Sequence, residues 1–172
     1  INSGTLDVIA RQITLSGTRV YNGTTTIQNS ELSIFNNIVS GETLALSGAG
    51  SIGSANVGSG KAVTLGTISL VDNTANASNY SLVSATIDVT ERPINFTSTR
   101  SYDGASSTDS TNISLSNLIN TETLNLSGTI SHSSSNAGIY STSDISTSSL
   151  ILSDGSNGGL SANYTLSGGT QS

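Results

Sequence analysis

The only histidine of the chain, His132, has the side chain most often used for general acid–base catalysis. Serines surround it and Asp144 follows, so the residue types of a Ser-His-Asp triad are present. A triad is defined by geometry, and serine is so common here that its nearness to His132 in the sequence carries no information. We therefore expect an exposed loop histidine, and we expect that the protein is not an enzyme.

Two glycine-rich segments have the residue types of phosphate-binding loops. The segment 48–53 fits the dinucleotide-binding pattern, with Asp72 near the place of a ribose-binding acid. Gly60-Lys61 resembles the end of a phosphate-binding loop, but Ala62 stands where a metal-binding hydroxyl is required. The dinucleotide motif also needs a helix N-terminus to hold the phosphate, and the residues after position 53 do not favour a helix. We expect glycine-rich turns and no cofactor.

Four aspartates recur in pairs and are the candidate metal ligands. Asp7 and Asp88 stand in similar segments, and Asp72 and Asp154 stand one predicted strand before such segments. Surface repeats often bind Ca²⁺ through carboxylates and carbonyls. However, no D-x-D-x-D-G loop is present, and isolated acids at strand ends are usually solvated or cap turns. With one histidine and no cysteine, zinc is not expected either, so we predict no bound metal.

Arginines and glutamates also recur. Arg19 and Arg100 stand shortly before a tyrosine, while Glu42 and Glu122 belong to a second recurring block. Recurrence of both partners predicts structural ion pairs, Arg19 with Glu42 and Arg100 with Glu122. Stacking of the arginine on an aromatic ring and plain surface solvation are the other interpretations.

The triplets Tyr21-Asn22-Gly23 and Tyr102-Asp103-Gly104 predict tight turns. Asn-Gly and Asp-Gly are the dipeptides best suited to a type I′ hairpin, because both central positions need positive φ. We expect each tyrosine to be a half-buried ring whose hydroxyl reaches a backbone partner.

These features belong to an internal repeat. The segment 11–23 recurs as 92–104, the block 41–48 recurs as 121–128, and Asn79-Tyr80 recurs as Asn163-Tyr164. In addition, Ser3–Val8 resembles Ser84–Val89. The sequence therefore predicts a tail strand of a preceding repeat at 1–9, a first module at 10–90 and a second module at 91–172.

Apolar and polar residues alternate over short runs, the pattern of half-buried strands. Representative runs are 13–15, 44–46, 63–65, 68–70 and 80–82, with 94–96, 113–115, 124–126 and 164–166 in the second module. Gly, Asn, Asp and Ser separate the runs, and no segment has a convincing helical period. We predict an all-β fold with two tandem small β-sandwiches of immunoglobulin-like type, elongated because the modules are linked end to end.

The composition excludes several classes of function. Charged residues are only 9% of the 172 residues, and 5 basic against 11 acidic residues give a net charge of −6. This charge repels phosphate backbones and anionic lipids, so neither nucleic acid nor membrane insertion is expected. No apolar run approaches the length needed to cross a bilayer.

The recurring Arg-x-Tyr-[Asn/Asp]-Gly, Glu-Thr-Leu, Asn-x-Gly and Asn-Tyr-x-Leu blocks together resemble the YDG repeat. Tyr102-Asp103-Gly104 matches the eponymous triplet, and Asn22 departs from it conservatively. Such repeats occur in tandem in large secreted adhesins of Gram-negative bacteria, including filamentous-haemagglutinin-like proteins. The resemblance implies an extracellular or cell-surface location, neighbouring repeats as partners, and host or surface ligands bound through other parts of the parent protein. It implies no catalytic residues.

Three functions compete for this sequence: a spacer in an adhesin stalk, a module that binds glycan or protein, and a hydrolase. The hydrolase lacks a defined site, as argued for His132. A carbohydrate-binding module usually displays aromatic platforms, whereas aromatic residues make up only 4% of this chain. We therefore expect a structural spacer that projects an adhesive region from the cell.

Overall fold

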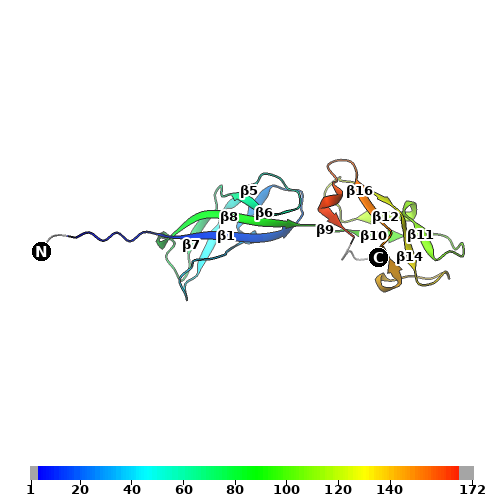
Figure 1. Cartoon of the computed structure of the whole chain (residues 1–172), viewed down its shortest axis with the longest axis horizontal. Coiled ribbons are helices and arrows are strands. Elements are labelled where there is room, and N and C mark those ends of the chain that lie inside the picture. Colours follow the sequence, from blue (N-terminus) through cyan, green and yellow to red (C-terminus); the bar gives the residue numbers. More distant parts are fainter. Residues whose placement is uncertain (1–3, 167–172) are drawn as a thin grey trace. The chain divides into compact units, whose positions relative to one another are not determined.

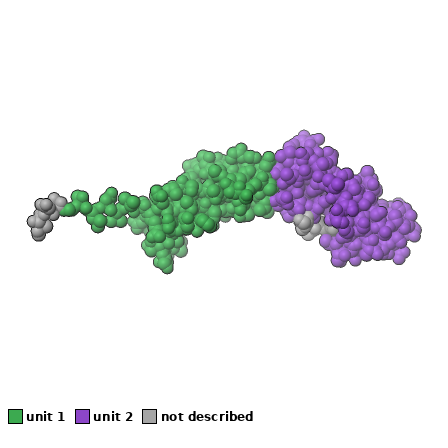
Figure 2. All heavy atoms as spheres, in the orientation of Figure 1, with its two compact units in different colours: residues 1–90 green, residues 91–172 purple. Residues whose placement is uncertain are grey.

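The structure is a computed structural model that describes residues 4–166. It divides into two compact units, Ile1–Thr90 and Glu91–Ser172, which Figure 2 shows in different colours. Both units consist of short strands, turns and single-turn 3-10 helices, and residues 4–166 contain no α-helix. The predicted all-β class and the two β-rich repeats are thereby confirmed.

The main element of unit 1 is a six-stranded sheet in the order β2-β5-β6-β8-β1-β3. The long strands β1 and β8 lie side by side at its centre and run parallel, from the pair Arg11–Tyr80 to the pair Val20–Thr90 (Figure 1). The other pairs are antiparallel. The strands are β1 Arg11–Val20, β2 Thr26–Gln28, β3 Leu32–Ile34, β5 Ala49–Ile52, β6 Gly58–Thr64 and β8 Tyr80–Thr90.

A separate antiparallel pair, β4 (Leu44–Ser47) and β7 (Ser69–Asp72), completes unit 1. Leu44 and Leu70 from this pair contact a buried cluster that includes Ile13 of β1 and Tyr80 of β8. Part of the core of unit 1 is therefore the cluster in which β1 and β8 contact the β4–β7 pair. Single-turn helices η1 (Asn29–Glu31) and η2 (Ala77–Asn79) precede β3 and β8.

The alternating sequence explains why the long strands are buried on one face. In β1 the side chains of Ile13, Leu15 and Arg19 point inward, and in β8 Ala85, Ile87 and Val89 do so.

Unit 2 repeats most of these strand pairs, but within the described residues they form four separate small sheets. β10 pairs with β12, β11 with β14, β14 with β15 and β13 with β16, all antiparallel, and β9 pairs with β17 in parallel. Its own buried cluster contains Phe96, Ile130 and Leu150. The elements are β9 Arg92–Pro93, β10 Asn95–Ser98, β11 Ser107–Asp109, η3 Ser110–Asn112, β12 Ile113–Ser116, β13 Leu124–Ser127, β14 Thr129–His132, η4 Thr142–Asp144, β15 Ile145–Ser146, β16 Ile151–Asp154, η5 Ser161–Asn163 and β17 Tyr164–Thr165.

The segment before β1 has no regular structure in residues 4–10. A tail strand was expected at 1–9, of which 1–3 lie outside the described residues. Such a strand would find its hydrogen-bonding partners in a preceding repeat, so its formation stays a prediction.

Candidate functional site

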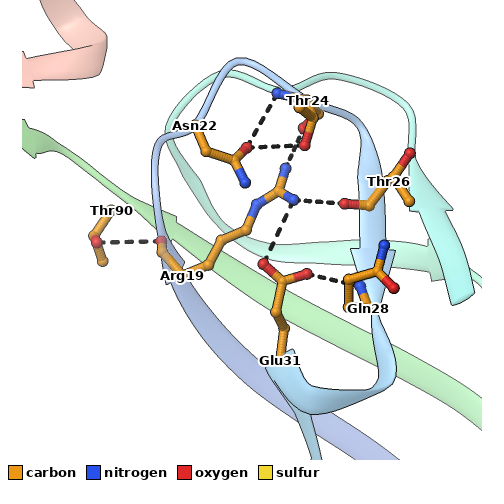
Figure 3. Close-up of polar contacts among 7 residues, drawn as sticks. All are labelled: Arg19, Asn22, Thr24, Thr26, Gln28, Glu31 and Thr90. Atoms are coloured by element: carbon orange, nitrogen blue, oxygen red, sulfur yellow. Dashed lines mark hydrogen bonds and ion pairs between the residues drawn. The ribbon is translucent and has the colours of Figure 1, made fainter. Parts of the chain in front are cut away.

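Arg19 is the centre of a buried polar site in unit 1, with its side chain only 4% exposed. Its Nη1 donates to the carbonyl of Thr26 at 2.7 Å, and Nη2 donates to the carbonyl of Thr24 (Figure 3). The Oε1 atom of Glu31 lies 3.8 Å from Nη1. The planar fork of the guanidinium thus connects β1 with β2 and with η1, and its Nε has no hydrogen-bond partner in the described part of the chain.

Arg100 takes the same place in unit 2 and keeps the carbonyl partner at the position of Thr24, which is Ala105, but its charged partner differs. Its Nη1 pairs with the carboxylate of Asp103, and its Nη2 donates to the carbonyl of Ala105. Nη2 also lies 3.2 Å from Nε2 of His132. The hydrogen bond from Arg100 lowers the pKa of Asp103, and the amide of Ala105 adds to that effect.

His132 is therefore not the exposed loop residue that the sequence predicted. It ends β14, is half-buried, and its ring lies 4.8 Å from that of Tyr140. Since arginine can only donate, Nε2 must accept from Arg100, which leaves Nδ1 to donate to the carbonyl of Ser134 at 2.6 Å. Both ring nitrogens are engaged in the fold.

The ion pairs predicted from the sequence, Arg19 with Glu42 and Arg100 with Glu122, are wrong. Unit 1 uses Glu31 and unit 2 uses Asp103. The partner acid is not at equivalent positions, because Asn112 stands in the place of Glu31 and Asn22 stands in the place of Asp103. Each unit has one acidic residue beside its arginine, but at a different position of the repeat. A search for acids that recur at the same position therefore could not identify either one.

The recurring glutamates bind tyrosines instead. In unit 1 the hydroxyl of Tyr80 donates to Glu42 and accepts from the amide of Val39 at 3.1 Å. In unit 2 the hydroxyl of Tyr164 donates to Glu122 at 2.5 Å and accepts from the amide of Ile119 at 3.0 Å. The hydrogen bond to Glu42, together with burial, raises the pKa of Tyr80. The tyrosine at the start of the last strand thus fixes the loop before β4 or β13.

The sequence analysis missed a second recurring contact, between the arginine that opens the repeated block, Arg11 or Arg92, and an asparagine. The side-chain amide of Asn117 donates to the carbonyl of Pro93 at 2.8 Å, while Arg92 donates to the Asn117 side chain at 2.6 Å. Arg11 and Asn37 make the corresponding contact at 3.5 Å. Both asparagines have positive φ, which this residue tolerates better than most, and that is the signal in the sequence that could have identified them.

The two YNG and YDG triplets form turns, but not type I′ hairpins. Gly23 and Gly104 have φ of 73° and 80°, whereas neither Asn22 nor Asp103 has positive φ. The side chain of Asn22 accepts from the amide of Thr24, and that of Asp103 accepts from the amide of Ala105, so both are Asx turns. The flanking strands do not pair with each other, because β1 pairs with β3 and β8 while β2 pairs with β5.

The two tyrosines of these triplets also differ from each other. Tyr21 is 3% exposed, as a packed ring should be, whereas Tyr102 is 66% exposed. The prediction of a half-buried ring in both units is therefore wrong, since one ring is fully buried and the other lies on the surface. The amide of Tyr21 donates to the carbonyl of Thr90 at 2.8 Å and so holds the turn against the end of β8.

Three of the four candidate calcium ligands accept hydrogen bonds from backbone amides. Asp72 accepts from Ala77 at 2.7 Å and Asp154 accepts from Ser161 at 2.8 Å, each capping the turn before a 3-10 helix. Asp88 accepts from the amide of Gly60 at 2.6 Å. Asp7 lies in the segment before β1. Within residues 4–166 no three His, Asp or Glu side chains come close enough together to hold a metal ion.

The glycine-rich segments have no features of a phosphate site. Segment 48–53 is strand β5 with its flanking turns, and Lys61 donates from Nζ to the carbonyl of Asn56 at 2.5 Å. In the part of the chain that is described, no helix is long and apolar enough to cross a membrane.

The two β-rich units share most of their strand pairs, the tyrosine–glutamate hydrogen bond and an arginine at the same position, and these features define a tandem β-repeat protein. The YDG domain family matches the chain twice, over residues 6–87 and 90–172. The chain therefore belongs to the YDG domain family and contains two tandem copies of the domain. Neither the curated proteins nor the solved structures gave a match.

Proposed function

We propose that this chain is a structural spacer segment from the stalk of a bacterial surface adhesin, in which each unit is a small immunoglobulin-like β-sandwich. The supporting observation is the parallel pairing of the first and last strands of unit 1. The chain enters at Arg11 and leaves at Thr90, at opposite ends of a ten-residue strand pair. With about 3.3 Å per residue, each unit then adds roughly 33 Å of length along the chain.

The connection between units supports the same function. Strand β8 ends at Thr90 and β9 begins at Arg92, so a single residue, Glu91, separates them. In unit 2 the first and last strands are again parallel, with Arg92 beside Tyr164. A repeat that is entered at one end and left at the other is suited to an array whose length grows with the number of units.

The sandwich assignment is supported in unit 1 by the apolar cluster in which the main sheet contacts the β4–β7 pair, and in unit 2 by the cluster in which Phe96 and Ile130 contact Leu126 of β13. An extracellular location on a Gram-negative cell is in keeping with a surface rich in hydroxyl and amide groups and poor in charge. Neighbouring units of the same chain are then its main partners, and ligands bind elsewhere on the parent protein.

The length of unit 1 can be measured with spin labels at its two ends, because the chain contains no cysteine that would be labelled as well. Spin labels on Ala10→Cys and Glu91→Cys should report a distance of about 30–40 Å by double electron–electron resonance. A second measurement compares chains of two, four and six units by small-angle scattering, where the maximum dimension should rise by a constant step. A label distance below about 20 Å, or a maximum dimension that levels off, would contradict the spacer.

A second candidate function, glycan binding, is favoured by one observation in unit 1. Phe35 is 71% exposed and lies at the edge of a shallow groove lined by Thr14, Asn36, Thr86 and Asp88. An exposed ring beside hydroxyl and carboxylate groups is a suitable surface for a sugar.

Unit 2 has Ser116 in the place of Phe35, so the groove is not a feature of the repeat. Reproducible micromolar binding on a glycan array that is lost in Phe35→Ser would favour this function over the spacer. The Phe35→Ser variant copies the residue of unit 2 and should fold normally, because the Phe35 side chain is exposed.

A further inference from the structure

The YNG and YDG turns differ in one chemical group. Asn22 has a side-chain amide where Asp103 has a carboxylate, and each side-chain oxygen accepts the main-chain amide two residues later, at 3.0 Å and 2.9 Å. In unit 2 the carboxylate also pairs with Arg100. In unit 1 the equivalent arginine, Arg19, has no acid at this position of the turn. Unit 2 therefore shows how a carboxylate in this turn contacts its arginine.

The side-chain amide of Asn22 has a fixed orientation. Its Oδ1 accepts from the main-chain amide and from the hydroxyl of Thr24, each at 3.0 Å. Nδ2 is then on the other side of the amide, which points toward the guanidinium of Arg19 (Figure 3). Within residues 4–166, Nδ2 donates to no acceptor, and the buried Nε of Arg19 has no acceptor either. A carboxylate in place of the amide would supply one, because it only accepts.

The residue after Asn22 makes hydrolysis of this amide chemically accessible. Gly23 has no side chain to shield its main-chain nitrogen from the neighbouring side-chain amide. It is exposed, and its amide donates to no residue in the part of the chain that is described. The two hydrogen bonds from Thr24 polarise the Cγ carbonyl of Asn22, and they stabilise the negative oxygen that forms when a nucleophile attacks Cγ.

We propose that Asn22 is a self-modification site and becomes an aspartate in the folded protein. The nitrogen of Gly23 loses its proton to hydroxide and bonds to Cγ of Asn22. The bond from Cγ to Nδ2 breaks, and the nitrogen leaves as ammonia after taking a proton from water. The product is a cyclic succinimide. Water then adds to Cγ, the bond to the Gly23 nitrogen breaks, and that nitrogen regains its proton. The net reaction consumes water and releases ammonia, with no oxidation or reduction.

The contacts around the turn favour aspartate over isoaspartate. Isoaspartate forms when water adds to the main-chain carbonyl of the succinimide, and it lengthens the main chain by one carbon atom. Here the main chain is held on both sides of the turn. The amide of Tyr21 donates to the carbonyl of Thr90 at 2.8 Å, and Arg19 donates to two carbonyls after the turn. Aspartate keeps these contacts. The inference goes beyond the spacer function and does not depend on it.

The chain contains its own control for the first test, because Asn157-Gly158 is its other Asn-Gly dipeptide. Both residues of this dipeptide are exposed. However, Nδ2 of Asn157 donates to the carbonyl of Thr121 at 3.0 Å, and its Oδ1 accepts from no residue within 4–166. The leaving nitrogen is therefore held, and the carbonyl is not polarised.

The unaltered chain is incubated at mildly alkaline pH, and peptide mass spectrometry follows the loss of each amide. Asn22 should react several-fold faster than Asn157 in the folded chain, and the two rates should converge in urea. Equal rates in the folded chain, or a difference that persists in urea, would overturn the proposal. Fragmentation by electron transfer distinguishes the products, and isoaspartate as the main product at position 22 would overturn the assignment of aspartate.

A second test removes the hydroxyl donor. Thr24→Val keeps the shape of the side chain and the main-chain donor, and it should slow the reaction at Asn22 several-fold. Thr25→Val is the matched control, since Thr25 is also exposed and its side chain makes no hydrogen bond within the described residues. Equal rates in the two variants would overturn the role of Thr24.

A third test concerns the new carboxylate. Asn22→Asp copies the product and should raise the melting temperature of unit 1, because it adds a charged acceptor beside Arg19. Asn36→Asp is the control, since Oδ1 of Asn36 also accepts from the amide and the hydroxyl of a threonine, Thr14. The rise should be larger for Asn22→Asp. Equal melting temperatures would overturn the contact with Arg19.

Discussion

At the scale of single residues, the two units hold an equivalent arginine that has a different acidic partner in each unit. Arg19 follows Ile13 and Leu15 on the inward face of β1, so its position in the strand forces the guanidinium into the protein. A buried guanidinium is stable where most of its donors are satisfied, and here two carbonyls and Glu31 contact the two Nη atoms while Nε has no partner in the described part of the chain. In unit 2 the side chain of Arg100 is 17% exposed and contacts Asp103 and His132.

Arg19→Ala should destabilise unit 1 by about 2–4 kcal/mol, because it leaves Glu31 and the two carbonyls without their donor. Arg100→Ala should cost unit 2 less, since water can replace the partially exposed guanidinium. Arg11→Ala, at an exposed arginine of the same strand, is the control and should change stability by less than about 1 kcal/mol. Urea denaturation, monitored in each unit by hydrogen exchange, gives the change in the free energy of unfolding for the three variants. Equal losses for Arg19→Ala and Arg11→Ala would contradict the buried site.

The lowered pKa values of four aspartates in unit 2 indicate how the stability of this unit changes with pH. Hydrogen bonds to their carboxylates lower the pKa of four aspartates: the Arg100 side chain for Asp103, the Thr111 amide for Asp109, the Ser141 hydroxyl for Asp144 and the Ser161 amide for Asp154. A group with a lowered folded pKa stabilises the protein above its unfolded pKa of about 3.9. This contribution is lost as the pH falls through the lower, folded pKa.

We therefore expect unit 2 to lose stability as the pH falls below about 4, with a shallower loss in Asp154→Asn. Denaturation midpoints between pH 6 and pH 2 measure the effect. At pH 6, Asp154→Asn should itself be less stable than the unaltered chain, because a neutral amide is a weaker acceptor for the Ser161 amide. An unchanged acid slope in this variant would show that the Asp154 hydrogen bonds do not contribute.

At the scale of elements, the turns between strands depend on close approach of the backbone. Gly48 separates β4 from β5 with φ of 83°, and a Cβ atom there would lie 2.1 Å from the carbonyl oxygen of Thr67. Gly128 separates β13 from β14 in the same way. At Gly48 the chain passes from β4, which pairs with β7, to β5 of the six-stranded sheet. At Gly128 it passes from β13, which pairs with β16, to β14 of the three-stranded sheet.

Gly48→Ala should destabilise unit 1 by more than about 2 kcal/mol, because positive φ and a backbone clash act together. Gly41→Ala is the matched control, since Gly41 has almost the same φ, 84°, and no atom within 4 Å of the added Cβ. That variant should lose only about 1 kcal/mol, from backbone strain alone. Thermal unfolding of the two variants would separate the two contributions, and equal melting temperatures would show that the loop of Thr67 moves aside.

At the scale of the whole molecule, each unit has its own core. The clusters around Ile13 and Phe96 belong to different units, and they share no residue. Leu15→Ala should therefore destabilise unit 1 by about 2–5 kcal/mol and leave unit 2 unchanged. Hydrogen exchange with peptides assigned to each unit is the appropriate measurement. Loss of protection in unit 2 as well would show that the two units unfold together.

The sequence by itself determined the all-β class, the two tandem copies and the YDG resemblance. Alternation and recurrence are local properties, and they survive in a one-dimensional pattern because a strand buries every second residue wherever it lies. The inward position of Arg19 follows from the same alternation with Ile13 and Leu15. The turns at Gly23 and Gly104 were also placed correctly, since positive φ is a local requirement.

Only the tertiary structure decided which residues meet. Glu42 binds Tyr80 and not Arg19, and strands β1 and β2 do not form a hairpin, because each strand pairs with partners from distant parts of the sequence. Recurrence identified Glu42 as important but could not give its partner, and it missed Glu31, whose counterpart is Asn112. An ion pair needs one nearby charge, and several positions around a buried arginine can supply it, so its location is fixed by packing and not by the repeat.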